Sequence, residues 1–245
     1  MSEATSTAQG TTVALVHGAF ADSSSWSGVI ERLHAAGTPV RTIVNPLRGI
    51  AADSAYVASA VQQIPGPVLA VGHSYGGAVI TNAATNADNV IGLVYVAAFA
   101  PDEGETLQDI EGTSRDSVLA SSLRESQYPV GSTGQMATEL FIDESKFRES
   151  FAADAPQTVA EDMAATQRPI AASGFGEKSG PPAWKKLPSW AVVATGDKAA
   201  GADVVLSMAQ RANARVTEVD GAHAIMVSQP TAVTDVILDA LRAMP

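Results

Sequence analysis

The amino-acid sequence predicts an α/β fold with a mostly parallel central sheet flanked by helices. Short apolar runs, each the length of a buried strand, alternate along the chain with stretches that carry apolar residues at helical spacing. This alternation is interrupted once, over residues 101–188, where the sequence is polar and favours helices. Because a bare loop of that length is rare in a compact domain, we expect a helical cap inserted between two strands of the sheet.

The expected strands are mostly apolar rather than alternating, which is typical of a parallel sheet covered on both faces. In chain order they are residues 12–18, 39–46, 68–72, 90–99, 190–195 and 215–219. The expected helices are residues 24–36, 53–64, 75–86, 202–212 and 231–243. The second of these helices is expected to start at Asp53, a good N-cap residue, and to stop before Pro65.

These elements divide the chain into three parts. Residues 1–10 are expected to form a flexible polar tail. Residues 11–100 and 189–245 would form the core domain, and residues 101–188 the cap. The tail has no basic region followed by an apolar stretch, so it does not resemble a secretory signal.

Composition excludes several classes of protein. The chain has 245 residues and a net charge of −11, with no cluster of basic residues, which argues against nucleic acid and anionic membrane as partners. No apolar run approaches the ~18 residues that span a bilayer. There is no cysteine, which removes disulfides, thiolate metal sites and a cysteine nucleophile. A cytoplasmic location fits this composition, and nothing in it indicates an oligomeric state.

Ser74 is the candidate nucleophile. It lies in Gly72-His73-Ser74-Tyr75-Gly76, between an expected strand and an Ala-rich expected helix. This G-x-S-x-G context is typical of a nucleophile elbow, a sharp turn that raises the serine hydroxyl above the edge of the sheet. The helix N-terminus that follows favours negative charge at this point.

A serine nucleophile needs a base and an acid that orients the base. His223 follows the last expected strand, and we interpret the other histidines (His17, His34 and His73) as packing or surface residues. Asp197 follows the strand after the insertion and is the favoured acid. Asp102, which follows the strand before the insertion, is the alternative. Asp197 falls between Ser74 and His223 in sequence and is preferred by its placement at the end of the strand after the insertion.

A tetrahedral intermediate also needs two N–H donors directed at its oxygen. One is expected from Tyr75, the residue after the nucleophile. The other is expected from the loop after the first strand, at Ala19, which follows His17-Gly18.

Together these motifs resemble the α/β-hydrolase superfamily. The segments LVHGAFADSSSW, GHSYGG, VVATGD and DGAHAIM are most similar to the branch of bacterial esterases, plant methyl esterases and plant hydroxynitrile lyases. The resemblance implies the α/β-hydrolase fold, a triad of Ser74, Asp197 and His223, and an oxyanion hole formed by Ala19 and Tyr75. It implies neither a metal nor an organic cofactor, and it places a substrate pocket beneath the cap.

The chain departs from the lyases of this branch at two positions. They carry a threonine after the first-loop histidine and a lysine after the catalytic histidine, where this chain has Gly18 and Ala224. We therefore expect a serine esterase acting on a small, largely apolar ester or lactone. A carbon–carbon lyase and a slow or non-catalytic receptor are the alternatives. Aromatic residues are the candidates for lining the pocket, first Phe20, Trp26 and Phe141, then Phe147, Phe151 and Phe175.

Overall fold

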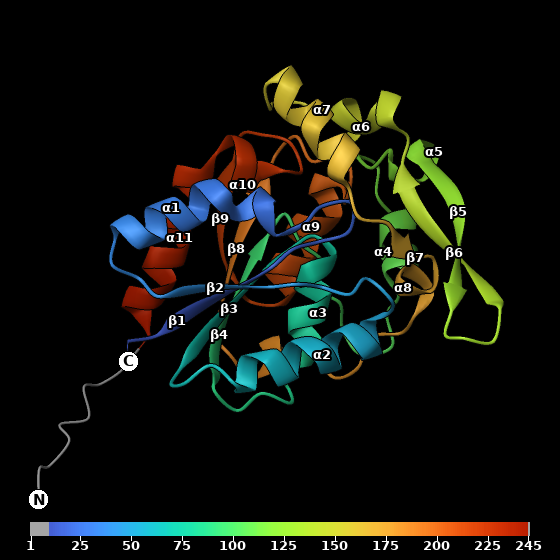
Figure 1. Ribbon diagram of the computed structural model, residues 1–245. Coiled ribbons are helices and arrows are strands. Elements are labelled where there is room, and N and C mark those ends of the chain that lie inside the picture. Colours follow the sequence, from blue (N-terminus) through green and yellow to red (C-terminus); the bar gives the residue numbers. More distant parts are fainter. Residues whose placement is uncertain (1–9, 245) are drawn as a thin grey trace, which may run out of the picture.

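A computed structural model describes residues 10–244, so nearly all of the expected N-terminal tail lies outside the described residues (Figure 1). At its centre is a six-stranded sheet of order β2-β1-β3-β4-β8-β9, in which every neighbouring pair is parallel. Its strands are β1 (Thr12–Val16), β2 (Val40–Ile43), β3 (Val68–His73), β4 (Val90–Val96), β8 (Ser189–Ala194) and β9 (Arg215–Val219). Each lies within or beside an expected apolar run, which confirms the α/β prediction.

Helices cover both faces of this sheet (Figure 1). On one side the core contains residues of α2 (Ile50–Gln62), α3 (Tyr75–Ala83) and α9 (Ala202–Arg211). On the other it contains residues of α1 (Ser27–Ala35), α10 (Ile225–Ser228) and α11 (Pro230–Ala243). Successive residues of β1 alternate between the two sides, with Ala14 and Val16 in one core and Val13 and Leu15 in the other. This double burial explains the continuous apolar runs of the strands.

Two helix starts differ from the sequence prediction. A short 3-10 helix, η1 (Ser23–Trp26), precedes α1 and is capped by Asp22, whose side chain accepts the amide of Ser24. Helix α2 begins at Ile50, so Asp53 lies in its first turn and is fully buried. The expectation that Asp53 caps this helix from outside is therefore wrong. Its carboxylate instead reaches back to the amides of Arg48 and Gly49.

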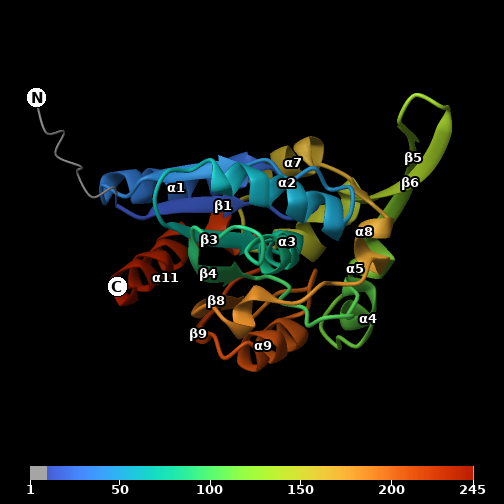
Figure 2. The same ribbon diagram turned by 90° about the horizontal axis from the view of Figure 1, so that it is seen from below.

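The sequence predicts a helical insertion between β4 and β8, but the insertion in the structure is not purely helical. It contains a separate antiparallel sheet of order β5-β6-β7. Its strands are β5 (Leu123–Val130), β6 (Gln135–Ile142) and β7 (Ile170–Ala171), and the β5–β6 hairpin extends away from the central sheet (Figure 2). The hairpin is largely solvent-accessible, so it lacks the apolar run by which a buried strand is recognised.

The remaining elements of the insertion are helices and short turns. They are α4 (Leu107–Gly112), α5 (Leu119–Ser122), α6 (Glu144–Phe151), α7 (Gln157–Thr166), α8 (Ser173–Gly176) and the 3-10 helix η2 (Ala183–Lys185). Across residues 10–244, no helix combines the length and the apolar character that crossing a bilayer requires.

Candidate active site

Ser74 occupies a strained turn between β3 and α3. Its φ of +52° and ψ of −125° are uncommon for a residue with a side chain, and such strain concentrates at functional sites. The turn is possible only because its neighbours are glycines. A Cβ on Gly72 would lie 2.5 Å from the carbonyl oxygen of Gly76, and one on Gly76 would lie 2.6 Å from that of Val16. The G-x-S-x-G spacing thus has a direct steric origin here.

His223 and Asp197 are brought together next to His73, the residue before Ser74, whose ring lies 4.7 Å from that of His223. The Nδ1 atom of His223 lies 2.7 Å from Oδ2 of Asp197, and both residues are buried. The other carboxylate oxygen of Asp197 accepts the amides of Ala199 and Ala200, at 2.9 and 3.0 Å. The carboxylate is therefore anchored on one oxygen and available to the imidazole on the other. A proton on Nδ1 leaves the Nε2 lone pair of His223 free to act as a base.

The alternative acid, Asp102, lies elsewhere. Its carboxylate is partly exposed and forms an ion pair with Lys185, whose Nζ is 2.5 Å from Oδ1. The hydrogen bond from Lys185 lowers the pKa of Asp102. The structure thus brings Asp197, and not Asp102, to His223.

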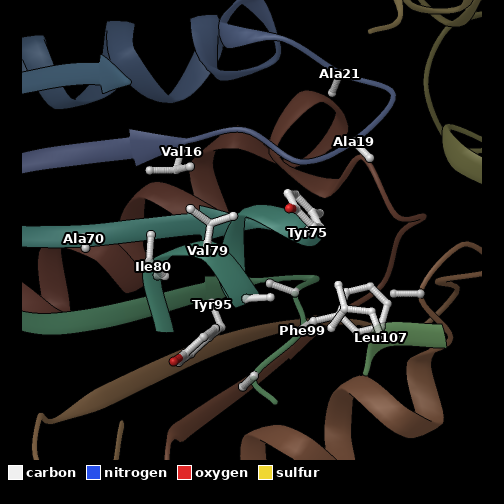
Figure 3. Close-up of a cluster of buried hydrophobic side chains, with 14 of the residues drawn as sticks. Val16, Ala19, Ala21, Ala70, Tyr75, Val79, Ile80, Tyr95, Phe99 and Leu107 are labelled. Atoms are coloured by element: carbon white, nitrogen blue, oxygen red, sulfur yellow. The ribbon is translucent and has the colours of Figure 1, made fainter. Parts of the chain in front are cut away.

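The two expected oxyanion donors lie at the carboxyl ends of adjacent strands. Figure 3 shows Ala19 on the loop after β1 and Tyr75 at the start of α3. Within residues 10–244, neither amide donates a hydrogen bond to another backbone oxygen. Free N–H groups beside a nucleophile are what an oxyanion hole requires.

Backbone hydrogen bonds connect the insertion to the three loops that carry Ala19, Asp197 and His223. The amide of Phe20, next to Ala19, donates to the carbonyl of Arg168 at 3.0 Å. The amide of Val118 donates to the carbonyl of Lys198, beside Asp197, at 2.8 Å. The amide of Ala224, beside His223, donates to the carbonyl of Phe151 at 2.9 Å. These contacts join residues that are distant in sequence, and no sequence motif predicts them.

Two other histidines near the turn are buried, and His73 lies close to the candidate base. His73 was expected to pack against the sheet, yet its Nε2–H donates to the carbonyl oxygen of His223 at 3.0 Å and the two rings are 4.7 Å apart. Burial holds the pKa of His73 well below its usual value, and the nearby His223 lowers it further. Burial also lowers the pKa of His17, whose Nε2 accepts the amide of Asn45 at 3.0 Å. Both imidazoles are therefore neutral near pH 7.

Of the aromatic candidates for the substrate pocket, some lie near His223 and others do not. The ring of Phe151 is 4.8 Å from that of His223, and Phe20 packs edge-on against Phe151. Phe147 packs on Phe151 at 5.0 Å and is fully buried. Trp26, a candidate for the substrate pocket, is instead part of the core beneath α1 and has no exposed surface. Phe141 is half-buried on β6, opposite Arg124 of β5.

A cavity of about 370 Å³ lies between the elements of the insertion. Its walls are mostly apolar and are formed by Gln108, Glu111, Leu119, Ala120, Leu123, Glu125, Leu140, Ala172 and Phe175. The ring of Phe175 also stacks on Phe20, with centroids 6.4 Å apart and planes inclined by 19°. Phe175 therefore contributes to the cavity wall and contacts the loop that carries Ala19. The volume falls within the range of small-molecule sites.

Comparison with known proteins identifies the family and supports the fold. A family model described as the alpha/beta hydrolase family matches residues 13–236. Polyneuridine aldehyde esterase is similar in structure, with a TM-score of 0.79 and 20% identity, covering 95% of this chain and 99% of the other. A pyrethroid hydrolase from Sphingobium faniae has a TM-score of 0.75 at 20% identity, covering 96% and 98%. A methylesterase from Arabidopsis has a TM-score of 0.75 at 18% identity, covering 95% and 99%. No curated protein matches the chain.

Proposed function

The chain belongs to the alpha/beta hydrolase family, and from that premise we propose that it is a serine esterase. It would cleave a carboxylic ester or lactone of a small, largely apolar substrate through an acyl-enzyme intermediate. The observation that carries this proposal is the 2.7 Å contact between His223 and Asp197, beside a serine held at a φ of +52°. This arrangement can generate a nucleophile without a metal or an organic cofactor.

The proposed reaction has two stages. Ser74 attacks the ester carbonyl while Nε2 of His223 takes the hydroxyl proton, and the amides of Ala19 and Tyr75 hold the oxyanion. His223 then returns the proton to the departing alcohol, which leaves an acyl group on Ser74. In the second stage His223 removes a proton from water as its oxygen attacks the acyl carbonyl. The bond to Oγ of Ser74 then breaks, His223 returns the proton to that oxygen, and the carboxylic acid leaves. Asp197 stabilises the imidazolium formed in each stage.

The substrate class follows from the cavity and from the similar proteins. The cavity wall combines apolar side chains with the carboxylates of Glu111 and Glu125 and contains no basic side chain, which favours an uncharged substrate over an anionic one. The similar structures are named as polyneuridine aldehyde esterase, a pyrethroid hydrolase and a methylesterase. Their names support ester cleavage as the reaction type. In this proposal residues 11–100 and 189–245 form the catalytic core, and residues 101–188 form a cap that receives the substrate.

The lyase alternative is disfavoured by Gly18. A Cβ at this position would lie 2.7 Å from the Cβ of Ser74 and 2.8 Å from the carbonyl oxygen of His73. A threonine there, as in the lyases that the sequence resembles, would not fit without moving the nucleophile. Ala224 likewise supplies no ammonium group to bind cyanide.

The decisive experiment measures release of p-nitrophenol from acetate and butyrate esters by the wild type and by Ser74→Ala. We expect the wild type to be active and the variant to lose at least ~10³-fold in kcat, because the acyl-enzyme cannot form. Ser189→Ala, which changes a serine that is equally buried at the start of β8, should retain activity. Equal rates for Ser74→Ala and wild type would rule out Ser74 as the nucleophile. Inactivity of a folded wild type on all esters would favour the receptor alternative.

A further inference from the structure

The segment from β2 into α2 lies behind both proposed oxyanion donors. Asn45 donates to His17 twice, from its amide to Nε2 at 3.0 Å and from its side-chain nitrogen to the carbonyl oxygen at 3.1 Å. His17 begins the loop that carries Ala19. A few residues further along, Asp53 accepts a hydrogen bond from the hydroxyl of Tyr75 at 2.8 Å. One segment of the chain therefore contacts the supports of both donors.

Asp53 is an unusual residue to find in this place. It has no exposed surface, and within residues 10–244 no ion pair involves it. Its carboxylate accepts the amide of Arg48 at 3.0 Å, the amide of Gly49 at 3.3 Å and the phenol of Tyr75. Burying a carboxylate without a cation is costly, and these donors with the N-terminus of α2 offset only part of the cost. Burial accordingly raises the pKa of Asp53.

The hydrogen bond between Asp53 and Tyr75 is connected to the nucleophile through a single residue. Tyr75 directly follows Ser74 and supplies the first residue of α3. Its ring is fully buried, so the phenol and the main-chain N–H are two ends of one immobilised residue. The direction of that N–H decides how well it meets an oxyanion, and loss of such a donor typically costs about 10²–10³ in kcat. A partial misalignment should cost less than this.

We propose that Asp53 is a positioning residue for the oxyanion hole, acting through the phenol of Tyr75 on the N–H beside Ser74. The inference rests on the proposed esterase function. It assigns the buried carboxylate a role in the transition state rather than in substrate binding. Its removal should therefore lower kcat and leave KM unchanged.

Tyr75→Phe is the primary test because it removes only the hydroxyl. Tyr95→Phe is a matched control. Tyr95, on β4, is equally buried (Figure 3). Its hydroxyl lies 2.8 Å from Oγ1 of Thr81, which belongs to α3 but is away from the N-terminus of that helix. We expect Tyr75→Phe to lower kcat for p-nitrophenyl butyrate about tenfold with KM within about twofold of wild type. Tyr95→Phe should leave both constants unchanged.

A second measurement separates a positioning role from a structural one. An aryl trifluoromethyl ketone forms a tetrahedral adduct with the serine, and its oxyanion occupies the same hole. Its inhibition constant should rise about tenfold in Tyr75→Phe and stay unchanged in Tyr95→Phe, even where thermal denaturation shows that both variants lose similar stability.

The partnership itself is tested with Asp53→Asn. If Asp53 acts through Tyr75, the double variant with Tyr75→Phe should be no slower than the slower single variant. A kcat for Tyr75→Phe equal to that of wild type would overturn the inference, and so would equal losses in Tyr75→Phe and Tyr95→Phe. Both outcomes leave Ser74-dependent hydrolysis by the wild type intact. Absence of that hydrolysis would instead overturn the proposed function, and the inference with it.

Discussion

Nδ1 of His223 lies 2.7 Å from Oδ2 of Asp197, and neither side chain is more than 1% exposed. The carboxylate cannot rotate freely, because its other oxygen accepts the amides of Ala199 and Ala200. A fixed acceptor at Nδ1 selects the tautomer that carries its proton there. The position of the base thus depends on a strand end more than 20 residues earlier in the chain.

Asp197→Asn should therefore abolish most activity without unfolding the protein. The amide has nearly the same shape, but it can present an N–H to Nδ1 and so favour the wrong tautomer of His223. We expect kcat for p-nitrophenyl butyrate to fall by about 10³–10⁴-fold. The matched control is Asp102→Asn, which changes the alternative acid in its exposed ion pair with Lys185 and should keep full activity. A larger loss in Asp102→Asn than in Asp197→Asn would reverse the assignment.

Gly18→Ala should impair the nucleophile through sterics alone. The added Cβ would lie 2.7 Å from that of Ser74, so the backbone of one loop must move. Because sub-ångström placement matters to catalysis, we expect kcat to fall by at least about tenfold. Gly112→Ala, at the end of α4, adds a methyl group with no atom within 4 Å and should have no effect. Wild-type activity in Gly18→Ala would show that the loop can relax around the nucleophile.

Much of this arrangement could be predicted from the sequence because its causes are local. A doubly covered parallel strand must be apolar on both faces, so β1 and β3 appear as continuous apolar runs. The nucleophile turn needs glycine at Gly72 and Gly76 for steric reasons, so it leaves a recognisable motif. The remaining candidates, Asp197 and His223, follow the ends of β8 and β9, so they are expected at the same edge of the parallel sheet as Ser74. Their catalytic roles stay predictions until the variants are measured.

What the sequence could not supply depends on tertiary contacts or on solvent. The β5–β6 hairpin is exposed on much of its surface, so its residues are polar and resemble a loop or a helix. Asp53 is a residue type that commonly caps helices, so the sequence alone suggests only that role. Its hydrogen bond with the hydroxyl of Tyr75 becomes visible only in the folded structure. Trp26 shows the reverse error, since an aromatic residue near a catalytic loop proved to belong to the core. Pocket residues and core residues share the same chemistry, and burial alone separates them.

Phe175→Ala should widen the range of esters that the enzyme accepts. The ring contributes to the wall of the cavity of about 370 Å³ and stacks on Phe20, so it lies between the cavity and the loop of Ala19. Removing it should raise kcat/KM for p-nitrophenyl octanoate by about tenfold relative to the acetate, since one or two more methylenes can then be buried. The ratio of the two esters, measured in one enzyme preparation, is insensitive to the active fraction.

Leu140→Ala, which enlarges the same cavity through another wall residue, controls for the effect of volume alone. If Phe175 determines access, Leu140→Ala should change the octanoate-to-acetate ratio by less than about threefold, because a larger cavity that stays separated from Ser74 receives no more substrate. An unchanged ratio in Phe175→Ala would show that the cavity does not receive the acyl chain.

The buried histidines predict how stability depends on pH. Burial lowers the pKa of His17 and of His73 from the ordinary value of 6.5. Below about pH 6.5 these two histidines are therefore protonated in the unfolded chain but remain neutral in the folded protein. The free energy of unfolding should fall as the pH drops below this value. Each histidine contributes a slope of up to about 1.4 kcal/mol per pH unit. Urea denaturation between pH 7 and 5.5 should show this loss, reduced by about half in His17→Gln and unchanged in His34→Gln, which alters an exposed histidine. A flat profile in the wild type would mean that both imidazoles accept a proton without opening the fold.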